Sequence, residues 1–88
     1  KTPEEAKLLE LKAQMMIVIR GLITSKGWNQ VEAAKQLKIT QPRVSNLTNG
    51  QVSKFSLDSL YEFLAICGYN FELNLVDGIP SIEAKDVA

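Results

Sequence analysis

The chain has 88 residues, of which 45% are apolar, enough to bury one modest core but not two. Ten basic residues balance ten acidic ones, histidine is absent and Cys67 is the single cysteine. This leaves no candidates for a metal cluster, acid–base catalysis or an internal disulfide. We therefore predict one small domain that is not an enzyme and binds no cofactor or metal. No apolar run approaches the ~18–20 residues that cross a membrane, and a single cysteine fits a reducing compartment, so we expect the protein in the cytoplasm.

The first predicted helix begins after Thr2 and ends at Gly27. Thr2 is the N-cap, Pro3 occupies the first helical position and Glu5 lies three residues beyond the cap, which together form a strong start signal. Its second half, residues 18–23, is expected to pack on the rest of the chain. Its first half is expected to overhang and touch a partner, with a longer local core as the alternative. The apolar residues of that half are Leu8, Leu9, Leu11 and Met15.

Two short helices joined by a tight turn are predicted next. Asn29 and Glu32 stand in capping-box positions, so the first of the two begins near Gln30. Ala33 and Ala34 put little bulk on its apolar face, which lets another helix cross closely.

The second of these helices is predicted from about residue 41 to residue 48. Thr40 is its N-cap, and Asn49-Gly50 ends it. Val44 and Leu47 should pack on the alanine face of the preceding helix. Two such helices with a turn of about three residues make a helix-turn-helix, which favours sequence-specific DNA binding.

Polar side chains of the second helix point away from this packing. Glutamine and asparagine can pair in bidentate fashion with adenine, and arginine with guanine. We therefore assign four residues to base reading: Gln41, Arg43, Ser45 and Asn46. Replacing Arg43 by alanine is expected to weaken operator binding with little loss of fold. The alternative is a polar helix face that only meets solvent.

Basic charge gathers on the same segment. Residues 26–54 carry five basic residues against one acidic residue, a net charge of +4, whereas residues 55–88 carry one against six, a net charge of −5. This local excess favours phosphate binding with marked salt dependence. It also favours a DNA-binding regulator over a pure interaction module of the same shape, in which the basic residues should be dispersed.

Residues 29–50 resemble the helix-turn-helix of the phage repressor and Cro class, the XRE family. Gln30 opens the first helix as in that family, Ala34 is the required small residue, and Asn49-Gly50 follows the second helix. The matching apolar positions are Leu37, Ile39, Val44 and Leu47.

The resemblance implies that Gln30 and Thr40 contact phosphates, while Gln41, Arg43 and Asn46 face the major groove. Further phosphate contacts are expected from Lys38, Asn49 and Lys54. For Lys54, a solvated loop charge is the alternative. Two positions depart from the family pattern: Lys38 stands where glycine is usual and needs a positive φ, and Pro42 occupies a site that often reads a base.

A further helix is predicted to open at Ser56 and Asp58 and to end at Gly68, with Phe55 packing beneath it and Cys67 buried. Residues 69–76 then alternate with period two and predict the only strand of the chain. Residues 77–88 should form a flexible tail, so the domain spans residues 1–76.

A single strand needs a partner for its backbone groups. We expect the same strand of a second copy, which gives a homodimer that reads two half-sites of a palindromic operator. Addition of a strand from a different protein is the alternative. The residues expected to contact a dimer mate or partner are Leu8, Leu11, Met15, Phe71, Leu73 and Leu75. The predicted fold is mainly α, a compact bundle of four to five helices containing a helix-turn-helix, with one C-terminal strand paired across a dimer.

Residues 41–45 and 55–57 are similar to antitoxins of the HigA type, which pair with ribonuclease toxins. This resemblance implies a dimeric repressor of a toxin–antitoxin operon that also neutralises a toxin. The sequence thus predicts a DNA-binding transcriptional repressor, with an antitoxin role implied by resemblance. A stand-alone phage-type repressor and a protein-interaction module are the alternatives.

Overall fold

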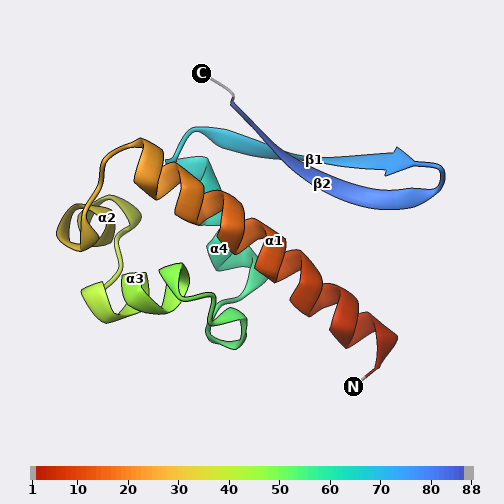
Figure 1. The fold of residues 1–88 in the computed structure, drawn as a ribbon, viewed down its shortest axis with the longest axis horizontal. Coiled ribbons are helices and arrows are strands. Elements are labelled where there is room, and N and C mark those ends of the chain that lie inside the picture. The colour runs from red at the N-terminus through yellow and green to blue at the C-terminus, as the bar shows by residue number, and fades with distance from the viewer. Residues whose placement is uncertain (1, 87–88) are drawn as a thin grey trace.

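The computed structural model describes residues 2–86, with side chains described for residues 2–69 and 77–78. Its elements are α1 (Pro3–Ser25), α2 (Gln30–Leu37), α3 (Gln41–Thr48), the 3-10 turn η1 (Val52–Lys54), α4 (Leu57–Ile66), β1 (Tyr69–Val76) and β2 (Ile79–Asp86). Helices α2 and α3 lie toward the C-terminal end of α1, and the β1–β2 hairpin extends away from them (Figure 1). The prediction of a mainly α fold is confirmed.

The helix boundaries follow local capping chemistry, as the sequence predicted. Each α-helix begins after a residue whose side-chain oxygen accepts a hydrogen bond from the backbone N–H three residues later, at 2.8–3.3 Å. Such caps satisfy backbone donors that the first helical turn leaves unpaired. The cap residues are Thr2, Asn29, Thr40 and Ser56.

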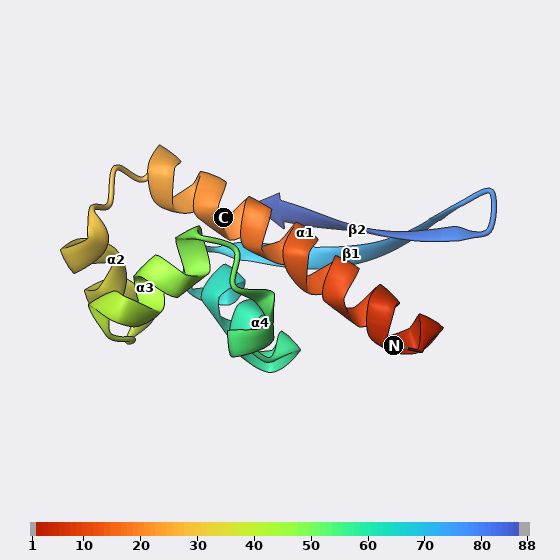
Figure 2. The same ribbon diagram turned by 60° about the horizontal axis from the view of Figure 1, so that its bottom comes forward.

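The core lies between α1, α2, α3 and α4, whose arrangement is seen in Figure 2. Its members are apolar residues that are at most 9% exposed. Ile19, Leu60 and Leu64 are among the most deeply buried, and Phe55 packs edge-on against Phe63 with ring centroids 6.0 Å apart. The core residues are Met15, Met16, Ile19, Leu22, Ile23, Ala33, Ala34, Leu37, Val44, Leu47, Phe55, Leu60, Phe63, Leu64 and Cys67.

The N-terminal half of α1 is less free than the sequence suggested. Met15, expected to contact a partner, is 3% exposed and belongs to the core of its own chain, so it is not available to a second molecule. Leu11 is half-buried against the same core, and Leu8 is 40% exposed. The alternative of a longer local core therefore holds for Met15, because it belongs to the core that α1 shares with α4.

The C-terminal segment forms an antiparallel hairpin, with Val76 opposite Ile79 and Tyr69 opposite Asp86. The strand expected over residues 69–76 is confirmed, but its partner is β2 of the same chain rather than a second copy. Residues 77–86, expected to be a flexible tail, form the turn and the second strand instead. Asp77 and Gly78 have φ values of 54° and 77°, and an Asp-Gly pair with two positive φ angles suits the type I′ turn that folds a strand back on its neighbour.

Cys67 is buried at the C-terminal end of α4, as expected. Burial raises the pKa of its thiol, and the positive charge of Lys26 offsets part of that rise. The thiol therefore stays protonated and packs as a small apolar group.

Candidate nucleic-acid interface

Helices α2 and α3 have eight residues each and are joined by Lys38, Ile39 and Thr40. They pack through small and branched side chains: Ala33 is fully buried, and Val44 and Leu47 are each 1% exposed. The turn is closed by backbone hydrogen bonds to the carbonyl of Ala34, including one of 3.0 Å from Ile39. The predicted helix-turn-helix arrangement is present.

Lys38 adopts the left-handed conformation that its position in the turn requires. Its φ is 61° and its ψ is 42°, and its backbone N–H donates to the carbonyl of Ala34. The side chain is exposed. A non-glycine residue here has a steric cost for its β-carbon, and Lys38 places a positive charge in the turn that leads into α3.

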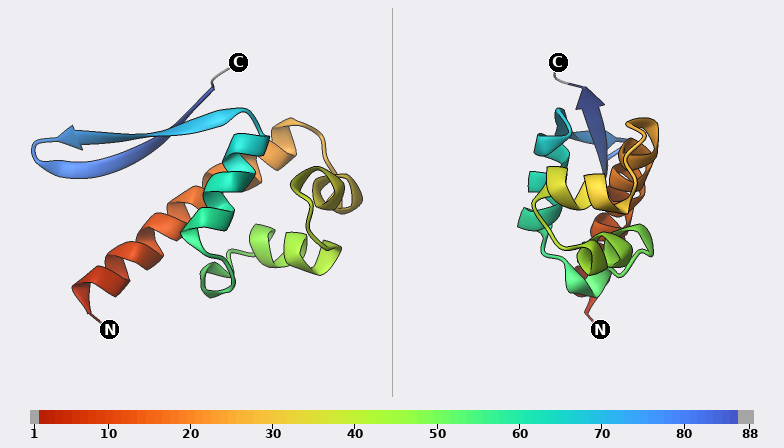
Figure 3. Two further views of the ribbon diagram at one scale, coloured as in Figure 1. Left: turned by 180° about the vertical axis from the view of Figure 1, so that it is seen from behind. Right: turned by 90° about the vertical axis from the view of Figure 1, so that its left-hand side faces the viewer.

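The solvent-facing side of α3 is polar. Successive residues of a helix are rotated by about 100°, so residues other than Val44 and Leu47 face away from the core. Gln41, Pro42 and Asn49 are exposed, and Ser45 and Asn46 are half-buried. The Asn49 amide donates to the Ser45 hydroxyl at 3.3 Å, so these two predicted contact residues are joined to each other. Figure 3 shows α3 at the end of the molecule away from the hairpin turn.

Arg43 does not lie with the other predicted base readers. Its Nη1 donates a hydrogen bond of 2.8 Å to the backbone carbonyl of Lys54, and its guanidinium lies 4.2 Å from the centre of the Phe55 ring. The side chain is half-buried. It is thus directed toward η1 and α4, along the flank of α3.

Most of the residues predicted to bind phosphate precede, open or flank one of the two helices, whereas Asn49 is the C-cap at the far end of α3. Gln30 is exposed at the first position of α2, and Lys54 is exposed at the end of η1. Thr40 accepts the Arg43 N–H as a cap, and its hydroxyl retains a proton to donate. The contact between Arg43 and the Lys54 carbonyl places Lys54 on one flank of α3, while Lys38 precedes its first turn.

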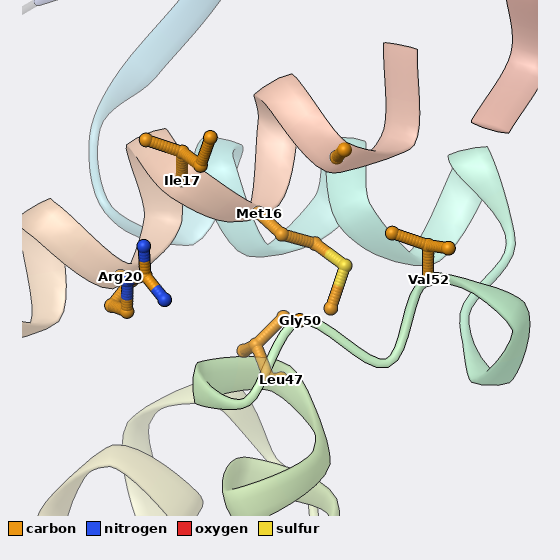
Figure 4. Close-up of a pocket in the computed structure, with 7 residues that line it drawn as sticks. Met16, Ile17, Arg20, Leu47, Gly50 and Val52 are labelled. Atoms are coloured by element: carbon orange, nitrogen blue, oxygen red, sulfur yellow. The ribbon is translucent and has the colours of Figure 1, made fainter. Parts of the chain in front are cut away.

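Arg20 of α1 holds the other end of α3, a contact that sequence reasoning missed. Its Nη1 donates a hydrogen bond of 3.1 Å to the carbonyl of Thr48, one of the carbonyls that the end of a helix leaves without an intrahelical partner. Nothing in the pattern around residue 20 signals a partner 28 positions away. The side chain borders a mostly apolar hollow of about 200 Å³ between α1 and the segment after α3 (Figure 4). Its lining residues are Ala13, Met16, Ile17, Arg20, Leu47, Gly50 and Val52.

The residues of the predicted dimer contact are only in part described. Leu8 keeps an exposed side chain, whereas Phe71, Leu73 and Leu75 lie in β1, where the described part of the chain is the backbone alone. No helix within the described residues combines the length and the apolar content that crossing a membrane requires.

A family model described as a helix-turn-helix domain matches residues 2–75. The chain belongs to this helix-turn-helix domain family. The match covers α1, the two motif helices, α4 and all but the last residue of β1, so these elements form one family unit. Membership supports DNA binding by the helix-turn-helix domain, and it names no narrower class within the family. A comparison with curated proteins found no match.

Proposed function

We propose that this helix-turn-helix protein is a sequence-specific DNA-binding transcriptional repressor. The observation that carries the proposal is the polar outer side of α3, which the packed α2 and the cap at Thr40 hold out to solvent. A major groove admits one α-helix, and the N-terminal residues of a recognition helix meet the bases first.

In this proposal the direct readers are Gln41, Ser45 and Asn46. The amides of Gln41 and Asn46 present the donor and acceptor pair that matches an adenine edge, and the Ser45 hydroxyl can meet several bases. Pro42, exposed between them, has only carbon to offer and suits the methyl group of thymine. Arg43 belongs to the predicted reader set as well, but its guanidinium is held by the Lys54 carbonyl and the Phe55 ring.

Phosphate binding is assigned to residues at the edges of this surface. Lys38 and Lys54 bring positive charge to the start of α3. Gln30 lies at the N-terminus of α2, where unpaired N–H groups and the helix dipole favour an anion. The full set is Gln30, Lys38, Thr40, Asn49 and Lys54. The same concentration of exposed charge argues against a module that keeps the shape without binding DNA.

We further propose that the repressor binds a palindromic operator as a homodimer that pairs through β1. In a two-residue turn the Val76 carbonyl accepts a hydrogen bond from the Ile79 N–H. Hydrogen-bonded and non-hydrogen-bonded pairs alternate along an antiparallel ladder, so the backbone groups of the next pair, Leu75 and Pro80, point away from the partner strand toward the outer edges of the hairpin. Pro80 has no N–H, which blunts the outer edge of β2. The outer edge of β1 contains no proline, and this favours β1 as the strand that a second copy joins.

The binding test begins with selection of the preferred duplex from random sequences, followed by fluorescence anisotropy across a range of salt concentrations. Wild-type protein is expected to bind with an affinity that falls linearly with salt on a logarithmic scale. Gln41→Ala is expected to lose about 1–3 kcal/mol of binding free energy on the selected duplex and to lose discrimination at one base pair, with little change in discrimination at the others. Gln14→Ala, an exposed glutamine on α1, is the matched control and should bind like wild type. Binding that is indifferent to salt and sequence would contradict the proposal.

An antitoxin role in a toxin–antitoxin operon is the narrower candidate. It is supported by the likeness of residues 41–45 and 55–57 to HigA-type antitoxins and by the open β1 edge, which could also accept a strand of a partner protein. A neighbouring reading frame for a small basic ribonuclease, whose product copurifies with this chain and loses activity on binding, would support it. A neighbouring gene of another kind would favour a stand-alone cytoplasmic repressor.

A further inference from the structure

Both arginines of the chain, Arg20 and Arg43, donate to backbone carbonyls of the segment that contains α3 and η1. Arg20 reaches from α1 to the C-terminal end of α3. Arg43 reaches out of α3 to the carbonyl of Lys54. The stretch after α3 is thus attached to the recognition helix by a side chain, in addition to its covalent connection.

The Arg43 contact is part of a continuous chain of packing. Its guanidinium lies over Phe55, which is 2% exposed and packs on Phe63 of α4. A cation above an aromatic ring is attracted by the negative face of the ring. The hydrogen bond and the ring contact hold the same guanidinium, so the first turn of α3 is tied to the core through one side chain.

The segment that carries Lys54 is held at both ends. The Gln51 N–H donates to the carbonyl of Asn46 at 3.0 Å, and the Lys54 N–H donates to the carbonyl of Gln51 at 3.0 Å. The Lys54 carbonyl accepts from Arg43. The backbone of Lys54 is therefore fixed relative to α3, while its charged end stays exposed.

We propose that Arg43 is a positioning residue that fixes Lys54 beside the recognition helix for phosphate binding, and that base reading falls to Gln41, Ser45 and Asn46. This inference rests on the proposed DNA-binding function and refines the site within it. To read guanine, Arg43 would have to leave both the Lys54 carbonyl and the Phe55 ring. Lys38 before α3 and Lys54 on its flank then bracket the helix, and phosphate contacts of this kind set the register of the protein on the duplex.

The test is a double-mutant cycle of Arg43→Ala and Lys54→Ala on the selected duplex and on its single-base-pair variants. Each single substitution is expected to weaken binding about five- to tenfold near 0.1 M salt, equally on every variant, and to reduce the salt slope by about one. The double variant is expected to bind like either single variant, because both remove the same phosphate contact. Gln14→Ala again serves as the control.

Different outcomes separate this inference from the function it rests on. Loss of discrimination at one base pair in Arg43→Ala would overturn the positioning role and make Arg43 a direct reader. Additive losses in the double variant would also overturn that role, because they would show that Arg43 affects binding independently of Lys54. Failure of wild type to bind any duplex in a salt-dependent way would overturn the proposed function and this inference with it.

A second measurement does not depend on the fold of any variant. The Arg43 side-chain N–H resonances of the wild-type protein are followed by NMR while the operator duplex is added. Signals that keep the shift of the carbonyl-bonded state support the positioning role. Intermolecular contacts from these protons to guanine would refute it.

Discussion

Replacing Lys38 by glycine separates two effects that this residue has on the molecule. At φ 61° its β-carbon is in a conformation that costs an L-residue about 1–2 kcal/mol, a cost that glycine avoids. Glycine also makes the unfolded chain more flexible, which lowers the free energy of unfolding by about 0.4–1 kcal/mol and offsets part of that gain. The difference between the midpoints of these ranges is a net stabilisation of about 0.8 kcal/mol, which corresponds to a rise in Tm of about 3–6 °C for a domain of this size.

The same substitution is expected to weaken DNA binding. Lys38 is exposed in the turn that leads into α3, and Lys38→Gly removes its charge from the proposed phosphate contact. The salt slope should fall by about 0.9, with a loss of about five- to tenfold in affinity near 0.1 M salt. Stability and binding thus move in opposite directions.

Lys38→Ala is the matched control, since it removes the charge but keeps the β-carbon. It should bind DNA as weakly as Lys38→Gly and have a Tm no higher than that of wild type. Thermal denaturation followed by circular dichroism and salt-titrated anisotropy give the two measurements. Equal Tm values for the two variants would refute the backbone argument, and an unchanged salt slope would refute the phosphate contact.

Three further predictions concern the core and the flank of the site. Leu60→Ala, at a fully buried position, is expected to lower the free energy of unfolding by about 2–5 kcal/mol; urea denaturation measures it, and Val31→Ala, at a position 60% exposed, should cost far less. Arg43→Ala is expected to lose about 1–2 kcal/mol of stability, because it removes a hydrogen bond to the Lys54 carbonyl and a cation–ring contact; a wild-type urea midpoint would contradict this. Burial raises the pKa of Cys67 above its ordinary 9.0, so its contribution to stability is full below about pH 9 and is lost as the pH rises through the folded pKa; Cys67→Ala should flatten that decline in alkaline urea titrations.

The helix boundaries could be predicted from the sequence because the interactions that set them are local. Asn29 and Thr40 accept N–H groups only three residues away, so the cap and its helix are visible in one short window. The positive φ of Lys38 was expected from the resemblance to the XRE family, in which glycine is usual at this position of the turn.

The hairpin and the placement of Arg43 depend on contacts that a short window does not contain. Asp77-Gly78 is a hairpin signal, but Pro80 and the few apolar residues after it gave the segment the composition of a tail. Arg43 bonds a carbonyl eleven residues away, and a backbone acceptor leaves no trace in residue type. The expectation that Arg43→Ala spares the fold therefore missed a contact that only the folded chain creates.

The short length of α3 explains why residues outside the proposed DNA contact matter for it. An isolated helix of eight residues is unstable in water, because nucleation is unfavourable and too few hydrogen bonds form to offset it. Its orientation must come from attachments: Val44 and Leu47 in the core, Arg20 at its C-terminal end and Arg43 along its flank. The outer side chains are not part of these attachments, so in the proposed function their identity can change the sequence that is read while the helix keeps its place. Under the proposed function, affinity and specificity are thereby carried by separate residues of one helix-turn-helix.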